Sequence, residues 1–475
     1  MRKAAFFASV ALSMSCLAGC FPEELVFWSP DGKVAAIRGG ETLYFCDGDG
    51  KILASHDGKY DHVAWMSDSK SFVGIRSAPV KTWDELVKLM DDDQRKLTVD
   101  QAEKWWREFK QHQGDMKSFK PSQADDIDVA AAGLYLRLKY PKELVEKLGQ
   151  EQWEQFASLY PDSSVAEVLE FKDGKAVVRT TVWTTIDSVD DIAVSRDGKK
   201  LAMTISRPGA PRDFSLLVLP LQKDSRPLRV AQRVAMQPGW SDDSRSVLYE
   251  QRVASVAKEG DLSLGKIMRQ NVYDEKGTIS VDLAEPVIVA YTIFGRLNKA
   301  AALGEETALF SGASTTLPSM DPPSGESLYV VKMSAAGEGR DPIRPLLKDA
   351  EAVPESFRLS PNRARAVFLV KEFQKVAVVT IADGKVVELD LQLPENRERN
   401  GNDRETGVPN WRNDEEVCVR VRRGSKLGSE ARSEVILWNI KTGKTRIISA
   451  DWPAELAKAI LDPSKEAEPT KEERE

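Results

Sequence analysis

Histidine and cysteine are scarce in this chain, which has three His and four Cys among 475 residues. The histidines are His56, His62 and His112, and no His-x-x-x-His or paired-Cys spacing occurs, so the sequence offers no zinc site. A Gly-x-Ser-x-Gly elbow, the usual signal of a serine hydrolase, is also missing. The sequence therefore predicts no metal, no cofactor and no recognisable set of catalytic residues.

Positive charge is not in excess either. Lys and Arg number 67 against 74 Asp and Glu, which gives a formal net charge of −7. Loss of Arg2 and Lys3 with an N-terminal leader would change this from −7 to −9. A nucleic-acid-binding face normally requires clustered positive charge, so no nucleic-acid partner is predicted. Beyond residue 20, no apolar run is long enough to cross a bilayer.

The N-terminal residues follow the pattern of a secretory leader. Arg2-Lys3 supplies positive charge, Ala4 to Leu12 forms a short apolar core, and Leu17-Ala18-Gly19-Cys20 resembles the bacterial lipobox. The resemblance implies removal of residues 1–19 and lipidation of Cys20, and several acyl chains together anchor a protein stably. Phe21 rather than Asp follows the cysteine, which favours the periplasmic face of the outer membrane. An ordinary leader with a chance cysteine is the alternative.

A six-residue phrase recurs along the chain between apolar segments. Repetition of this kind is typical of stacked, similar structural units. The copies are Trp28-Ser29-Pro30-Asp31-Gly32-Lys33, Trp65-Met66-Ser67-Asp68-Ser69-Lys70, Val194-Ser195-Arg196-Asp197-Gly198-Lys199, Trp240-Ser241-Asp242-Asp243-Ser244-Arg245, the faint Ala302-Leu303-Gly304-Glu305-Glu306-Thr307, Leu359-Ser360-Pro361-Asn362-Arg363-Ala364 and Trp411-Arg412-Asn413-Asp414-Glu415-Glu416.

Each copy has the composition of a hairpin turn. In the first copy Pro30 presets φ, Asp31 can hydrogen-bond the backbone two residues on, and Gly32 supplies a positive φ. An acidic or amide residue stands at the fourth position of every copy, whereas the fifth position varies. Turns with a long side chain at that fifth position are expected to differ in shape, namely those with Glu306, Arg363 and Glu415.

The segments around the turns predict the fold. The strand after each turn is almost entirely apolar, as in strands covered on both faces. Two further strands per unit give four antiparallel strands, and a ring of such sheets is a β-propeller. We predict a mostly β chain with a single β-propeller of about seven four-stranded blades over residues 20–449. Six or eight blades are the alternatives. Residues 450–475 are expected to form a charged, disordered tail, with one or two helical turns near Ala454 to Leu461 at its start.

The Trp-Ser-Pro-Asp-Gly-Lys phrase between such strands resembles the WD-like repeat of the TolB-like β-propeller proteins. The resemblance extends from about Leu25 to Ser449 and implies a fold rather than a role, because propellers of this type include binding proteins, scaffolds and enzymes. The chain lacks the separate α/β domain that precedes the propeller in TolB, so the role of that protein is not carried over.

Between residues 81 and 161 the hydrophobic period changes from two to about 3.6, which predicts a helical insertion in the second blade. Thr82 and Thr98 each begin a capping-box pattern and are expected to start helices. Trp105 and Trp106 lie in the insertion. They either build its core or form part of a surface that recognises a partner.

Cys46 lies in the first repeat unit and Cys418 in the last. Ring closure would make these units neighbours, and an exported protein can form disulfides. A disulfide between them is one interpretation, and two small buried thiols are the other.

The sequence favours a lipid-anchored, non-catalytic binding or scaffold protein of the cell envelope with an envelope protein or peptide as partner. Asp47-Gly48-Asp49-Gly50 has the composition of a strand-connecting turn and lacks the further ligands of a calcium loop. An envelope hydrolase with paired carboxylates at the propeller centre is the alternative, but 74 acidic residues do not single out a pair. A purely structural envelope component is the third hypothesis.

Overall fold

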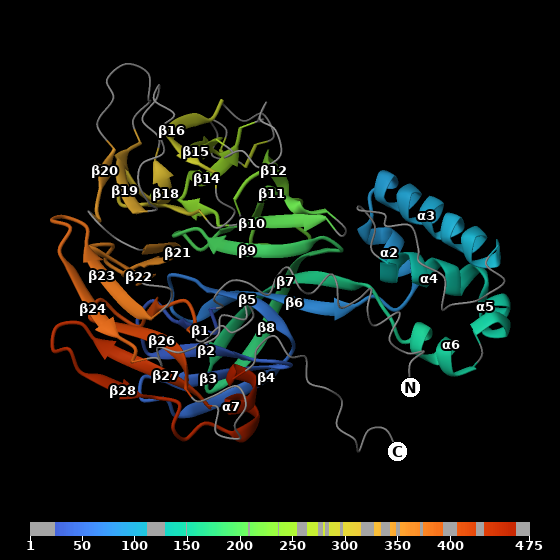
Figure 1. Cartoon of the computed structure of the whole chain (residues 1–475), viewed down its shortest axis with the longest axis horizontal. Coiled ribbons are helices and arrows are strands. Elements are labelled where there is room, and N and C mark those ends of the chain that lie inside the picture. Colours follow the sequence, from blue (N-terminus) through green and yellow to red (C-terminus); the bar gives the residue numbers. More distant parts are fainter. Residues whose placement is uncertain are drawn as a thin grey trace.

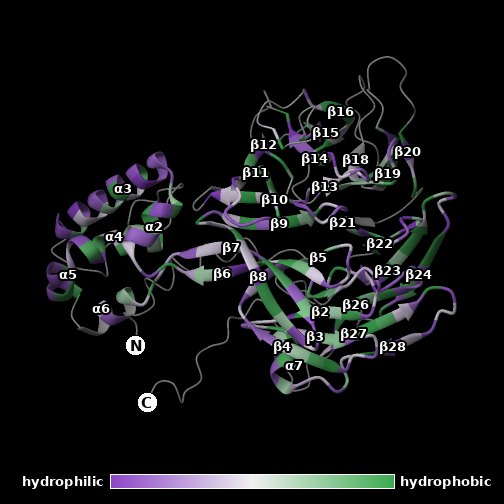
Figure 2. Ribbon diagram, turned by 180° about the vertical axis from the view of Figure 1, so that it is seen from behind, coloured by the Kyte–Doolittle hydropathy of each residue, from purple (hydrophilic) through white to green (hydrophobic). Residues whose placement is uncertain are grey.

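Strands dominate the computed structural model, which describes residues 24–111, 129–148, 150–207, 210–235, 237–253, 264–273, 279–280, 285–294, 298–314, 327–333, 343–347, 352–370, 374–392, 406–423 and 432–461. They form seven antiparallel four-stranded blades in chain order (Figure 1), which confirms the predicted β-propeller and its blade count. Most of the apolar residues lie within the sheets (Figure 2).

The blades have the following strands. Blade 1 contains β1 (Val26–Trp28), β2 (Val34–Gly39), β3 (Thr42–Asp47) and β4 (Ile52–Asp57). Blade 2 contains β5 (Tyr60–Trp65), β6 (Ser71–Pro79), β7 (Asp162–Lys172) and β8 (Lys175–Thr185). Blade 3 contains β9 (Ser188–Val194), β10 (Lys200–Arg207), β11 (Ala210–Pro220) and β12 (Leu228–Gln232). Blade 4 contains β13 (Gly239–Trp240), β14 (Ser246–Arg252), β15 (Leu264–Asn271) and β16 (Val287–Ile293).

The remaining blades continue the pattern. Blade 5 contains β17 (Ala300–Ala302), β18 (Thr307–Ser314), β19 (Ser327–Lys332) and β20 (Arg344–Pro345). Blade 6 contains β21 (Ala352–Leu359), β22 (Arg365–Val370), β23 (Lys375–Thr380) and β24 (Val386–Asp390). Blade 7 contains β25 (Asn410–Trp411), β26 (Glu416–Arg423), β27 (Arg432–Asn439) and β28 (Thr445–Ile447). Strands β16 and β18 also pair with each other, so blades 4 and 5 share one sheet.

The phrase forms the turn between the first two strands of a blade, and its serine and acidic residue hold that turn. In blade 3 the Ser195 hydroxyl donates to Asp197 at 2.6 Å and accepts from the Lys200 amide at 3.0 Å. The turn also bonds to the next blade, because the Asp197 amide donates to the hydroxyl of Ser244 at 3.1 Å. The same contact joins Asp31 in blade 1 to Ser69 in blade 2 at 3.1 Å.

The tryptophan of the phrase bonds in the opposite direction, to the preceding blade. The indole of Trp65 donates to the Phe27 carbonyl at 2.8 Å, and that of Trp240 donates to the Ala193 carbonyl at 2.9 Å. The indole of Trp411 makes the equivalent bond to the Arg358 carbonyl at 2.8 Å. Each acceptor belongs to the innermost strand of its blade. The phrase therefore ties blade 1 to blade 2, blade 3 to blade 4 and blade 6 to blade 7.

The fifth position of the phrase follows the expected backbone geometry in most copies. Gly32 and Gly198 have φ of 68° and 66°. Ser69, Ser244 and Arg363 adopt the same left-handed conformation, with φ of 57°, 58° and 57°. Glu306 and Glu415 are not among the residues with positive φ, so those two turns differ in shape as predicted, whereas the same prediction for the turn with Arg363 is wrong.

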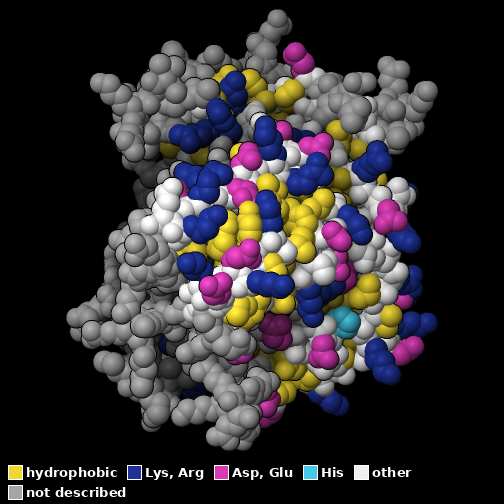
Figure 3. Space-filling view, turned by 90° about the vertical axis from the view of Figure 1, so that its right-hand side faces the viewer, with side chains coloured by type: hydrophobic (Ala, Val, Ile, Leu, Met, Phe, Trp, Pro, Cys, Tyr) yellow, Lys and Arg dark blue, Asp and Glu magenta, His cyan; other side chains and the backbone are white. Residues whose placement is uncertain are grey.

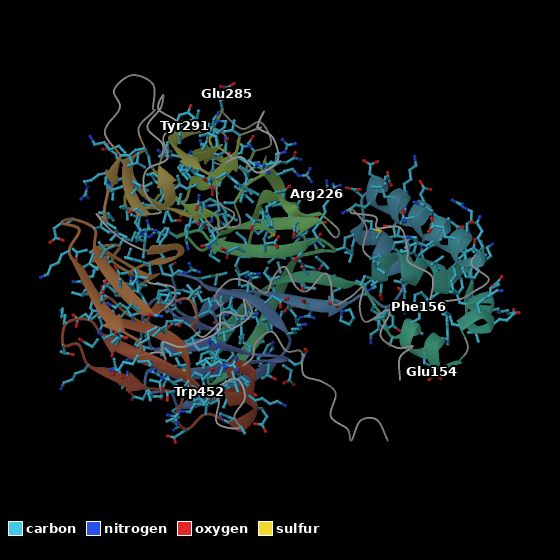
Figure 4. All side chains as sticks on the ribbon, viewed as in Figure 1. Glu154, Phe156, Arg226, Glu285, Tyr291 and Trp452 are labelled. Carbon is cyan, nitrogen blue, oxygen red and sulfur yellow. The ribbon has the colours of Figure 1, made fainter. Side chains whose placement is uncertain are left out.

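The ring closes between blades 7 and 1 without sharing a strand between the chain ends. Strand β1 contacts β25, and helix α7 (Ala454–Leu461) packs against β2 and β27. The indole of Trp452 donates to the Gly50 carbonyl at 2.8 Å (Figure 4). Arg446 donates to the Gly48 carbonyl at 2.8 Å, and Arg412 donates to the Gly32 carbonyl at 3.1 Å. Closure therefore depends on side chains and on the segment that follows the last strand.

The helical insertion leaves blade 2 after β6 and returns at β7. Its helices are α2 (Trp83–Leu89), α3 (Asp92–Gln111), α4 (Val129–Lys139), α5 (Pro141–Leu148) and α6 (Gln150–Ala157). Thr82 caps α2 with the predicted capping box. The prediction that Thr98 starts a helix is wrong. Asp91 and Gln94 hydrogen-bond each other's backbone at the start of α3, and Thr98 lies inside it, donating to the Gln94 carbonyl.

The indole bonds between blades predict a stability difference between two equally buried tryptophans. Trp240 and Trp28 are each 6% exposed, but Trp28 Nε1 has no oxygen acceptor within the described ranges. Trp240→Phe should lower the free energy of unfolding by about 1–2 kcal/mol more than Trp28→Phe, because it leaves the Ala193 carbonyl without its donor. Urea unfolding of both variants measures the difference, and equal losses would contradict the role of the indole bond.

Candidate functional site

The inner strands of the blades bring polar side chains together at the ring axis. Four of these residues lie three positions before the first residue of the phrase, namely His62, Asp191, Gln237 and Lys299. Two others, Arg358 and Asn410, lie one position before it. Side chains two apart on a strand face the same side, so both positions face the same way. With Glu24 from blade 1, all seven blades contribute to this set, which we call the axial polar cluster.

Hydrogen bonds cross the ring within the axial polar cluster. Arg358 of blade 6 donates to Glu24 of blade 1 through Nη2 at 2.7 Å and Nε at 3.0 Å. Its Nη1 lies 3.5 Å from the Gln237 amide oxygen of blade 4. The Asn410 side chain of blade 7 donates to Glu24 at 2.6 Å. Because blades 6, 1 and 4 are not neighbours, these groups can meet only near the axis.

The ion pair between Arg358 and Glu24 is largely shielded from water, with side chains 19% and 16% exposed. Burial alone would lower the pKa of Arg358, but the negative charges of Glu24 and Asp191 outweigh it and raise that pKa. Two hydrogen bonds to one carboxylate are among the stronger pairings available to arginine. The guanidinium is therefore held in one orientation at the centre of the ring.

Lys299 is the second cation at the axis. Its Nζ lies 5.5 Å from the ring centre of Phe357, and the side chain is half-buried. Burial and, to a smaller extent, the nearby positive charge of Arg358 lower the pKa of Lys299 to about 7, although Asp191 and Glu24 oppose the shift. Near neutral pH this amine is therefore present in both its neutral and its charged form.

Both histidines of the described residues are used in structural contacts. His62 Nε2 lies 2.9 Å from the Val189 carbonyl, so this nitrogen carries the proton and donates. Burial lowers the pKa of His62, which favours the neutral ring. His56 Nε2 lies 3.2 Å from the Tyr60 hydroxyl, which itself donates to Glu167 at 3.0 Å. His112 lies outside the described residues.

An acidic residue beside the axis occupies a β-bulge. Asp190 is the extra residue of β9, where the pairing with β10 shifts between Thr204 and Ile205. Burial, together with the negative charges of Asp191 and Asp187, raises the pKa of Asp190 to about 7, although the hydrogen bond from Ser206 opposes the shift. Its buried Oδ2 has no hydrogen-bond partner within the part of the chain described. Bulges often re-aim a side chain near functional sites.

The structure places the residues singled out in the sequence as follows. Trp105 and Trp106 are 8% and 3% exposed and lie in the core of the insertion, together with Phe156 (Figure 4). Because both indoles are buried, they do not form the partner-recognition surface that one of the two sequence hypotheses gave them. The hypothesis that they build the core of the insertion is the one that agrees with the structure. Cys20 lies outside the described residues.

Cys46 and Cys418 are buried, free thiols in the structure, which agrees with the interpretation of two small buried thiols and not with the disulfide. Both belong to the hydrophobic cluster between blades 1 and 7, as expected for neighbours across the ring closure. Burial raises the pKa of each thiol to about 12, which keeps them protonated at neutral pH. Across the described ranges, no three His, Cys, Asp or Glu side chains are grouped so as to hold a metal ion.

Sequence reasoning did not find the axial polar cluster. A usable signal was present, because polar residues recur three positions before the phrase in blades 2 to 5. The partners could not be assigned, since Arg358 and Glu24 are separated by 334 residues and join non-adjacent blades. Only the curvature of the complete ring determines which inner strands face one another across the axis.

No protein-family model and no curated protein matches this chain. Among solved structures it is similar to tricorn protease, with 11% identity and a TM-score of 0.43, covering 91% of this chain and 36% of that one. It is also similar to Kuenenia stuttgartiensis hydrazine synthase, with 9% identity and a TM-score of 0.43, and the match covers 90% of this chain and 95% of that one. A third similar structure is the oligogalacturonate lyase of Vibrio parahaemolyticus, with 9% identity and a TM-score of 0.39, and the match covers 60% of this chain and 71% of that one. Tricorn protease and this lyase are β-propeller proteins, and the likeness concerns the fold alone.

Removal of Arg358 tests the axial ion pair. Arg358→Ala should lower the free energy of unfolding by about 3–5 kcal/mol, because it leaves the shielded Glu24 carboxylate without its cation. Arg95→Ala is the control, since Arg95 and Asp92 form a pair whose side chains are 48% and 92% exposed. That loss should stay within about 1 kcal/mol. Chemical unfolding gives both values, and similar losses would show that the axial pair contributes no more than a surface pair.

The low pKa of Lys299 predicts a pH dependence of stability. In the unfolded chain a lysine titrates near ~10.4, whereas Lys299 titrates at about 7 in the folded protein. Between these values the unfolded chain binds more protons, so the contribution of Lys299 to folding becomes more favourable as pH rises from 7 toward 10. The free energy of unfolding of wild type relative to Lys299→Met should therefore increase between pH 7 and pH 9.5. A constant difference would mean that the amine titrates normally.

Proposed function

We propose that this protein is a lipid-anchored component of the cell envelope that acts as a non-catalytic binding or scaffold protein with an envelope protein or peptide as its partner. The anchor would be Cys20, which follows a charged n-region, a short apolar core and a lipobox-like Leu-Ala-Gly-Cys sequence. The proposed location is the periplasmic face of the outer membrane. Among the described residues, no helix has the length and apolar character that a bilayer crossing requires.

The observation that carries the binding role is the pairing within the axial polar cluster. Arg358 and Asn410 both donate hydrogen bonds to Glu24 across the ring. These side chains are therefore engaged with one another and are not a free set of catalytic acids and bases. Turns of the phrase add hydrogen bonds between blades 1 and 2 and between blades 3 and 4. A ring tied at its rim and at its axis is a rigid support that can present loops and an insertion to a partner.

An envelope hydrolase is the second candidate, and Asp190 is the observation that favours it. A buried carboxyl group with a pKa near 7 is suited to proton transfer at neutral pH, and strongly shifted pKa values gather at functional sites. Asp191 is the adjacent residue, and it also influences the pKa of His62 and Lys299. Glycosidases act through a pair of carboxylates that flank the bond they cleave.

Affinity capture and lipid labelling test the proposal together. The lipidated protein, extracted from membranes in mild detergent, should carry labelled fatty acid and should retain a stoichiometric envelope protein or peptide. Cys20→Ser should abolish the label, and Cys46→Ser should leave it unchanged. Absence of label would contradict the anchor. Hydrolysis of a glycan or peptide that is lost in Asp190→Asn would replace the binding role with an enzymatic one.

A further inference from the structure

The two ends of the propeller ring carry different parts of the chain. The phrase turns, which join the first and second strands of each blade, lie at one end, here called the turn end. The first strand begins at the opposite end, where the second strand finishes, as the pairing of Val26 with Ile37 and of Tyr60 with Arg76 shows. The insertion leaves β6 after Pro79 and returns at Asp162, so it also lies at this opposite end, here called the insertion end.

Glu24 places the N-terminal segment at the insertion end. It stands two residues before β1, and its carboxylate is bonded to Arg358 and Asn410 at the axis. Cys20 is four residues earlier in the chain. Four residues span at most about 14 Å even when fully extended. A lipid on Cys20 is therefore confined to the neighbourhood of the insertion end.

We propose that the insertion end of the ring faces the membrane and that the helical insertion rests on the lipid surface. The inference depends on the proposed lipidation of Cys20 and adds an orientation to it. A lipid within about 14 Å of the axis cannot reach a bilayer that lies beyond the turn end, because the full depth of the ring would separate them. Tethered in this way, the protein keeps the insertion in contact with the bilayer.

The insertion is fixed to the ring and cannot swing away from that end freely. Asp91 pairs with Arg207 of β10 at 3.3 Å, and Gln94 donates to Asp187, between β8 and β9, at 3.2 Å. Leu86 and Leu134 pack against Ile186 in one hydrophobic cluster. The helices therefore project from blades 2 and 3 at a set position (Figure 1).

The exposed surface of the insertion suits a lipid interface. Nine large hydrophobic residues are exposed in the described part of the chain, and four of them, Leu97, Leu138, Leu159 and Tyr160, lie in this insertion, with Leu138 at 61% exposure. Seen from the side of the insertion, hydrophobic side chains gather in the middle of the face, surrounded by charged ones (Figure 3). Apolar side chains bordered by Lys and Arg are typical of surfaces that lie in the headgroup region.

The orientation also determines which surface is free for a partner. The sixth position of the phrase is basic and exposed in blades 1 to 4, with Lys33, Lys70, Lys199 and Arg245. These side chains lie at the turn end, away from the membrane in the proposed orientation. The turn end is thus the surface that a partner in the periplasm would meet.

Depth-dependent quenching tests the orientation. Leu138→Cys places a thiol on α4. Val386→Cys places one at the start of β24, where Val386 is 39% exposed. Val386 pairs with Val379, which in turn pairs with Ala366 just after the phrase turn of blade 6, so this position lies at the turn end. Each lipidated variant is labelled with bimane and reconstituted into phosphatidylethanolamine–phosphatidylglycerol vesicles with or without brominated acyl chains. Native Cys46 and Cys418 are 0% and 2% exposed, and the protein without a new cysteine measures their background labelling.

Brominated lipid should quench the label on Leu138→Cys at least threefold more than the label on Val386→Cys. Equal quenching or the reverse order would overturn the orientation. A change in bimane emission on Leu138→Cys that follows protein concentration instead of bromination would assign this surface to a second copy of the chain and would also overturn the proposal. If fatty acid is present on Cys20 but the label on Val386→Cys is quenched more strongly, only the proposed orientation is wrong. If no fatty acid is present on Cys20, the proposed lipid anchor is wrong.

Discussion

Closure of the ring is the constraint on which the rest of this structure depends. Blade 1 is built wholly from the start of the described chain and blade 7 wholly from its end, so no strand is shared across the joint. Side chains and a following segment hold it instead, with α7, Trp452 and Arg412 spanning the two blades. The cluster between them is apolar and includes Trp28 and both buried thiols. Only with this joint closed do the inner strands surround a common axis.

The axial polar cluster is a consequence of that closure. Its central pair joins residues separated by 334 positions and belonging to blades that are not neighbours. Such a pair forms only when the remaining blades are in place, so it reports on the complete ring. The cluster includes Lys299, whose pKa burial lowers toward neutral pH, and it lies next in sequence to Asp190, whose pKa burial raises toward neutral pH. A rigid ring with titratable groups near its axis is compatible with a binding role and keeps a carboxylate-based reaction as the second candidate.

Much of the fold could be predicted because its determinants are local. The phrase identifies its turns through residues that bond within six positions, as Ser195 and Asp197 do. Thr82 and Pro141 begin helices for reasons that can be read from neighbouring residues. Thr98 carries a similar pattern but lies inside α3, because a second capping pair at Asp91 and Gln94 starts that helix seven residues earlier. Where two local signals compete, the packing of the whole insertion selects between them.

The sequence by itself determined the repeated four-stranded unit, a count of about seven blades through its phrase copies, and the helical insertion in the second unit. These features depend on turn chemistry and periodicity over short stretches of chain. The tertiary structure alone decided that Trp105 and Trp106 are core residues, that Cys46 and Cys418 remain free thiols, and that Arg358 meets Glu24 at the axis. The physical reason is that burial and long-range pairing depend on where distant segments come to lie, and in a ring this is fixed only when the last blade meets the first.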